Sequence, residues 1–195
     1  LAVPDITRKF IKENSFSSDN IEKYCNMKIN ELRKITIQNS ISYAEWIQAA
    51  KIKAKILYYA SMKNLNFDLG FIDDEFEFFV HNDYKNLSTE VNSKAPVILP
   101  KTLEFISGSK AALIVMDGMS VFDFEIISHH WGNISYDFNG SFAMIPTTTA
   151  ISRQCLLSAK YPRELKNPFN LSGEEKQFRE AAENLGYLPK QILYT

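Results

Sequence analysis

The stretch ALIVMDGMSVFDF, residues 112–124, decides the fold that we expect for this chain. It opens with apolar side chains only, and together with Ala111 these make a continuous apolar run over residues 111–116. A short run without a polar residue is typical of a strand that is buried on both faces of a parallel sheet. The run stops at Asp117 and Gly118. The sequence therefore predicts a buried parallel strand over 111–116, followed by a sharp turn.

The segments around this strand alternate between helical and extended patterns. Pro96 and Pro100 mark the change of texture that opens this half of the chain. Beyond the strand we expect a helix over 120–131, one long strand or a strand pair over 133–145, a helix over 149–160, a helix from Ser172 to Gly186, and a strand over 191–195. Alternating strands and helices indicate an α/β fold, with a parallel sheet covered by helices on both faces.

Residues 1–95 have a different pattern, which predicts a helical N-terminal segment. Asp19 with Glu22, and Ser42 with Glu45, match the spacing of a capping box, and each pair opens a segment with helical apolar spacing. A third amphipathic helix is predicted over 73–87. We therefore divide the chain into a helical segment, 1–95, and an α/β part, 96–195.

The composition excludes several classes of protein. Positive and negative charges nearly cancel, with 22 Lys and Arg against 23 Asp and Glu, so the charge balance does not indicate nucleic acid or an anionic membrane as a partner. No apolar run reaches the roughly 20 residues that a membrane-spanning helix needs, and the first residues lack the pattern of a signal peptide. The default expectation is a cytoplasmic protein.

Asp117 is the first candidate for a functional residue. In an open parallel sheet, ligands bind beyond the carboxyl ends of the strands, and Asp117 directly follows the end of the predicted strand. Its carboxylate would then project into the ligand crevice. The alternative is that Asp117 caps the helix that follows.

A second candidate is the sequence PTTT, residues 146–149. Pro146 ends the preceding extended segment, and Thr147, Thr148 and Thr149 occupy the loop and the start of the next helix. Free backbone N–H groups and the helix dipole favour an anion such as phosphate at this place. The alternative is an ordinary threonine N-cap without a ligand.

These two motifs together resemble a known family. The MDG at 116–118, followed by PTTTAISRQCLLSAKYP at 146–162, looks like the opening of the alkaline phosphatase superfamily, and within it the PglZ family of BREX-type phage-defence systems. The resemblance covers roughly residues 105–195. It implies that residues 96–195 are the N-terminal part of an alkaline-phosphatase-like parallel sheet sandwiched by helices.

The resemblance also implies a reaction and a set of site residues. In the superfamily, the Asp after the first strand is a metal ligand, and a Thr or Ser at the start of the next helix is the nucleophile, usually over two zinc ions. The phosphodiesterase relatives read Pro-Thr-x-Thr, with Tyr-Pro ending the motif. That register assigns Thr149 as nucleophile and metal ligand and Asp117 as a metal ligand. The implied function is metal-dependent hydrolysis of a phosphomonoester or phosphodiester, with zinc or another divalent metal as cofactor and phage-defence proteins as partners.

The chain departs from the family pattern after Thr149. The remaining metal ligands of the superfamily are Asp and His residues that follow the nucleophile, and no Asp or His follows Thr149 here. We therefore expect a piece of a longer protein that is inactive by itself, because the metal site is incomplete. Such a piece would leave apolar surface uncovered and would self-associate. The alternative function is a non-catalytic interaction or scaffold component of a phage-defence assembly.

Overall fold

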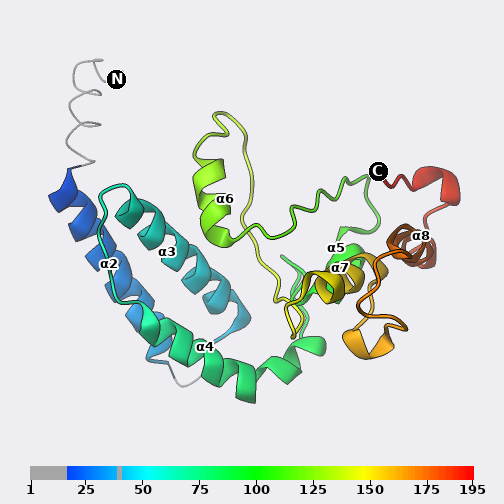
Figure 1. The fold of residues 1–195 in the computed structure, drawn as a ribbon, viewed down its shortest axis with the longest axis horizontal. Coiled ribbons are helices and arrows are strands. Elements are labelled where there is room, and N and C mark those ends of the chain that lie inside the picture. Colours follow the sequence, from blue (N-terminus) through cyan, green and yellow to red (C-terminus); the bar gives the residue numbers. More distant parts are fainter. Residues whose placement is uncertain (1–16, 39–40) are drawn as a thin grey trace. The chain divides into compact units, whose positions relative to one another are not determined.

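The computed structural model describes residues 17–38 and 41–195, and it divides into two compact units. One unit is formed by residues up to Asn82 together with Met119–Tyr136, and the other by Asp83–Gly118 together with Asp137–Thr195. Figure 1 shows that helices and irregular segments make up the described part of the chain. No helix among the described residues has the length and apolar character needed to cross a membrane.

The first unit is built from α-helices. They are α2 (Ser18–Thr36), α3 (Tyr43–Ser61), α4 (Gly70–Asn82) and α6 (Val121–Ser128). Helix α3 packs against both α2 and α6, and α2 also contacts α4. Trp46 lies at the centre of an aromatic cluster, with its ring centroid 5.1 Å from that of Phe76 and 5.4 Å from that of Phe79.

Local capping signals explain where these helices begin. The predicted capping box of α3 is confirmed, because the Ser42 N–H donates to Glu45 Oε2 at 2.8 Å and the Glu45 N–H donates to Ser42 Oγ at 3.4 Å. Helix α2 begins earlier than the pattern predicted, since Ser17 is its N-cap and Asp19 already lies in the first turn. The helix predicted over 73–87 is α4 followed by a 3₁₀ segment, Tyr84–Ser88.

The second unit is organised around α7 (Thr149–Ser158). The other helical elements of this unit are α5 (Thr102–Ile106), α8 (Glu174–Asn184) and four 3₁₀ turns, Tyr84–Ser88, Leu99–Lys101, Pro162–Glu164 and Pro189–Gln191. Helix α7 contacts α8, α5 and the turn at Leu99–Lys101. On α7, Ile151, Cys155 and Leu157 are buried. The predicted start of this helix at Thr149 is confirmed.

Gln154 ties α7 to its surroundings in the second unit. Its side chain is buried, and its Nε2 lies within hydrogen-bonding distance of the carbonyl oxygens of Ala150, Asn167 and Pro168, at 3.3, 3.2 and 2.8 Å. It also accepts a bond from Gln177 Nε2 at 3.4 Å. These contacts hold the loop before α8, and α8 itself, against α7.

The predicted parallel sheet is wrong. Among the described residues there is no strand, and β-pairing is confined to one isolated parallel bridge between Ile98 and Phe142. We expected strands over 111–116, 133–145 and 191–195. Apart from that bridge the first two segments are irregular, and the third is irregular after Gln191, which ends a 3₁₀ turn. The alkaline-phosphatase-like sheet that the family resemblance implied is therefore absent from the described part of the chain.

The reason is that an apolar run favours burial but does not determine which segment would cover it. Ile114 is 82% exposed and Met116 is 54% exposed. Within the described residues, no backbone–backbone hydrogen bond joins residues 111–116 to another segment. A parallel strand needs neighbouring strands brought alongside by crossover connections, and neither 133–145 nor 191–195 pairs with this segment. The run consequently stays unpaired.

Candidate functional site

Asp117 does not cap the helix that follows it. Helix α6 has Ser120 as its N-cap, in a capping box in which the Ser120 N–H donates to Asp123 Oδ2 at 2.9 Å and the Asp123 N–H donates to Ser120 Oγ at 3.1 Å. Gly118 lies between them at a φ of +74°, a left-handed conformation that glycine adopts without strain. The capping alternative for Asp117 is therefore wrong.

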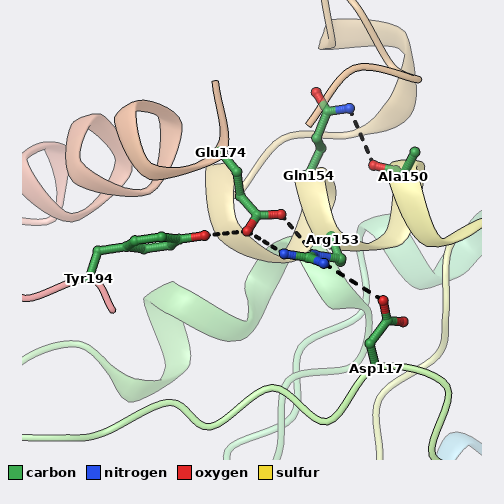
Figure 2. Close-up of polar contacts among 6 residues, drawn as sticks. All are labelled: Asp117, Ala150, Arg153, Gln154, Glu174 and Tyr194. Carbon is green, nitrogen blue, oxygen red and sulfur yellow. Dashed lines mark hydrogen bonds and ion pairs between the residues drawn. The ribbon is translucent and has the colours of Figure 1, made fainter. Parts of the chain in front are cut away.

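The Asp117 carboxylate instead lies beside a side chain of α7. Its Oδ2 is 3.8 Å from Nη1 of Arg153, and the Asp117 side chain is 45% exposed. Figure 2 shows Asp117 and Glu174 on different sides of the Arg153 guanidinium. The end of the apolar run and helix α7 are thus linked through Arg153.

Thr149 is the first residue of α7, and the threonines before it are exposed. Thr148 occupies the N-cap position, but its side chain makes no capping hydrogen bond. The first intrahelical bond runs from the Ser152 N–H to the Thr148 carbonyl oxygen at 2.9 Å. The N–H groups of the preceding turn have no acceptor within the helix, as at any helix N-terminus. The alternative to an anion site was an ordinary threonine N-cap, and a threonine, Thr148, does occupy that position, although its side chain makes no capping bond.

Arg153 lies one helical turn after Thr149, on the same face of α7. Its guanidinium forms a two-point contact with Glu174 on α8, in which Nε donates to Oε2 at 2.8 Å and Nη2 donates to Oε1 at 2.6 Å. The Tyr194 hydroxyl donates to Oε1 of the same carboxylate. Glu174 is therefore the centre of a network that joins α7, α8 and the segment at Tyr194 (Figure 2).

The electrostatics of this network follow from its hydrogen bonds. Burial alone would raise the pKa of Glu174, but the hydrogen bonds from Arg153 and Tyr194 outweigh it and hold the pKa below its usual value. The bond to Glu174 raises the pKa of the Arg153 guanidinium, and also that of the Tyr194 hydroxyl. At neutral pH, Glu174 and Arg153 are a charged pair, and Tyr194 is a neutral donor.

The described residues do not assemble a metal site. They include no group of three or more His, Cys, Asp or Glu side chains arranged to hold a metal ion. Catalytic zinc sites use three protein ligands and an open position, whereas Asp117 has a guanidinium beside it. A metal at Asp117 and Thr149, as the resemblance implies, would need more ligands than the described residues bring to this place.

His129 and His81 contact residues that do not belong to the network of Arg153 and Glu174. His129 is the C-cap of α6, and its ring stacks on Tyr58 with centroids 4.3 Å apart. Its Nδ1 is 2.6 Å from the carbonyl oxygen of Glu125. His81, on α4, has an exposed side chain 3.8 Å from Glu77.

Sequence reasoning missed Arg153, Glu174 and Tyr194. For Arg153 a signal was present, because its spacing of four residues from Thr149 places the two side chains on one face of the predicted helix. Glu174 and Tyr194 had no comparable signal, since they reach Arg153 only through the packing of α8 and of the segment at Tyr194.

Comparisons with protein-family models, with curated proteins and with solved structures found no match to this chain.

Proposed function

We propose that this chain contributes the nucleophile side of a phosphoric-ester hydrolase of the PglZ type, a component of a phage-defence system. In this proposal Thr149 attacks the phosphorus atom, and Asp117 is a ligand of the metal that the natural protein uses. The observation that carries it is the orientation of Asp117, whose carboxylate lies at Arg153 on α7, one turn from Thr149, and does not cap α6. The sequence motifs at 116–118 and 146–162 supply the reaction class.

The chemistry of the residues themselves supports this assignment. Thr149 stands in the first turn of a ten-residue helix, where free N–H groups and the helix dipole favour an anion. Its hydroxyl would meet a phosphoryl group bound there. Attack would form a new P–O bond while the bond to the leaving alcohol breaks, the hydroxyl proton would leave with that alcohol, and water would then release the phosphate from Thr149. Because the described residues do not complete a metal site, no step is assigned to a metal here.

The first prediction tests the nucleophile. In the natural protein that carries this sequence, Thr149→Ala should lower hydrolysis of a chromogenic aryl phosphate or aryl phosphodiester by about a thousandfold or more, since no covalent route remains. Asp117→Ala should also abolish turnover. Thr148→Ala is the matched control, and it should only weaken the reaction because Thr148 is the N-cap residue of α7 and its side chain makes no capping bond.

The assay is run with added zinc and, separately, with manganese. The 195-residue chain alone should show no turnover, because Asp117 and Thr149 cannot fill the positions of a zinc site. Full activity in the Thr149→Ala variant, or metal-dependent turnover by the 195-residue chain, would exclude the assignment.

A second candidate function is supported by the exposed apolar run. We infer in this case a non-catalytic interaction component of a phage-defence assembly, in which residues 111–116 pair with an extended segment of another chain. A cavity of about 650 Å³, lined in part by Leu113, Phe178 and Leu193, lies beside this run. Unpaired backbone groups next to an apolar cavity are features that strand addition uses. Light scattering over a concentration series, with and without the substitution Ile114→Asp, tests this pairing.

A further inference from the structure

The segment that leads into α7 is fixed first by its backbone. The Phe142 N–H donates to the Val97 carbonyl oxygen at 2.9 Å, and the Leu99 N–H donates to the Phe142 carbonyl oxygen at 3.1 Å. The side chains of Phe142 and Met144 are buried. These contacts anchor the segment at Phe142, a short distance before the sequence PTTT.

Closer to α7, the Tyr84 side chain provides the contact that backbone pairing does not. Between Ala143 and Thr147, no backbone–backbone hydrogen bond joins the chain to another described segment. The Tyr84 hydroxyl donates to the Ala143 carbonyl oxygen at 2.6 Å. Burial raises the pKa of this hydroxyl, and a hydrogen bond with the Ile145 backbone opposes that shift. At neutral pH the hydroxyl is therefore a protonated donor, and it contacts the backbone at two points just before PTTT.

The turn that carries Tyr84 is itself held in place. Tyr84 opens the 3₁₀ turn Tyr84–Ser88, in which the Leu87 side chain is only 2% exposed. The hydroxyl of Tyr161, a residue that follows the end of α7, donates to the Ser88 carbonyl oxygen at 3.5 Å. Because its turn is buried and bonded, Tyr84 is a rigid support for the segment before α7, and precise sites need such supports.

The contacts of Tyr84 bear on the position of the proposed nucleophile. We propose that Tyr84 is a positioning residue for the hydrolase reaction, whose hydroxyl fixes residues 143–145 and thereby the place of Thr149 at the start of α7. Attack at phosphorus needs the Thr149 oxygen in line with the leaving group, and a displacement of about 1 Å can lower a rate by about a hundredfold. This inference rests on the proposed function and adds to it the side chain that aligns the nucleophile.

The first measurement is amide hydrogen exchange of the 195-residue chain by NMR, which needs neither substrate nor metal. Tyr84→Phe keeps the ring and removes the hydroxyl, so the Ile145 amide should exchange about threefold to tenfold faster. The Phe142 amide, whose hydrogen bond does not involve Tyr84, should keep its rate. Tyr187→Phe is the matched control, because Tyr187 is also half-buried and its hydroxyl donates to a backbone carbonyl oxygen, that of Ser109, at 3.0 Å.

The second measurement is the hydrolysis of an aryl phosphate by the natural protein with added metal. Tyr84→Phe should lower kcat by about tenfold to a hundredfold and change KM by less than about twofold, because the nucleophile is displaced while the helix N-terminus remains. A residue that only stabilised the fold would lower the melting temperature but not the kcat of the folded protein. Circular dichroism melts therefore accompany the kinetics, and Tyr187→Phe should keep both kinetic constants.

The outcomes separate this inference from the proposed function. Faster exchange at Ile145 but not at Phe142, together with a lower kcat, supports the positioning role. The inference is overturned if Tyr84→Phe leaves the Ile145 rate unchanged, if Phe142 accelerates equally, or if Tyr187→Phe has the same effects. It is also overturned if hydrolysis depends on Thr149 but Tyr84→Phe keeps the wild-type kcat. A natural protein that does not hydrolyse phosphate esters refutes the proposed function, whereas the exchange rates still decide whether Tyr84 fixes the segment before Thr149.

Discussion

At the scale of single residues, Glu174 is a buried charged side chain of the second unit. Its carboxylate is buried, and the bonds from Arg153 and Tyr194 hold its pKa below the ordinary value of about 4.3 for glutamate. A group whose pKa is lower in the folded state adds stability above its unfolded pKa, and this contribution disappears as the pH falls through the folded pKa. Glu174 should therefore stabilise the fold at neutral pH and stop doing so in acid.

The prediction is that Glu174→Gln lowers the melting temperature near neutral pH and flattens its fall as the pH is lowered from about 6 to about 3. The neutral amide cannot form the charged pair with Arg153, so this part of the acid dependence is lost. Glu183→Gln, an exposed position on the same helix, is the control and should keep the wild-type profile. A Glu174→Gln profile parallel to wild type over that pH range would contradict the assignment.

The site residues show what sequence could and could not predict at this scale. Asp117 and Thr149 could be singled out from the sequence, because Asp117 follows the apolar run and Thr149 opens a predicted helix, and both patterns are local. Their roles in catalysis stay predictions. Glu174 could not be predicted, because its partner Arg153 lies 21 positions away along the chain and only the packing of α8 on α7 joins them.

At the scale of elements, the segment 110–117 has a pattern that fits a second copy of itself. Lys110 and Asp117 flank six apolar residues. In an antiparallel pair of two such segments in the central register, Lys110 of each copy would lie opposite Asp117 of the other, and apolar residues would lie opposite apolar residues. The unpaired backbone of this segment would gain hydrogen bonds at the same time.

We therefore predict that the protein self-associates through residues 110–117. Light scattering over a concentration series should show a mass above that of the monomer, and Ile114→Asp should return it toward the monomer by placing a charge in the apolar row. Val91→Asp is the matched control, because Val91 is also a highly exposed apolar residue of this unit but lies outside the segment. A strictly monomeric wild-type protein at high concentration would refute the pairing.

The elements also show why helices were predicted better than strands. The start of α3 follows from Ser42 and Glu45, and that of α7 follows from the sequence after Pro146, because capping is decided within a few residues. The strand at 111–116 was predicted from its composition alone. A strand exists only when it pairs with another strand, and no pattern within residues 111–116 indicates which segment that would be.

At the scale of the whole molecule, the two units are interleaved along the chain. Residues Met119–Tyr136 belong with the N-terminal helices, whereas the segments on either side of them belong to the second unit. The sequence predicted a division at residue 95, from a change of texture near Pro96. A change in sequence pattern depends only on residues that are close along the chain. The units depend on which segments pack together, and α6 packs on α3.

Each unit also contains one fully buried cysteine, Cys25 in the first and Cys155 in the second. Burial raises the pKa of both thiols, that of Cys155 to about 11, so neither reacts as a thiolate while its unit stays closed. The rate at which a thiol reagent modifies each cysteine therefore reports how often its unit opens. Peptide mapping after timed labelling should show that Leu32→Ala, in the first core, accelerates Cys25 about tenfold or more, while Ile151→Ala does so for Cys155. Equal acceleration of both thiols by either substitution would mean that the interleaved units open together, as one cooperative body.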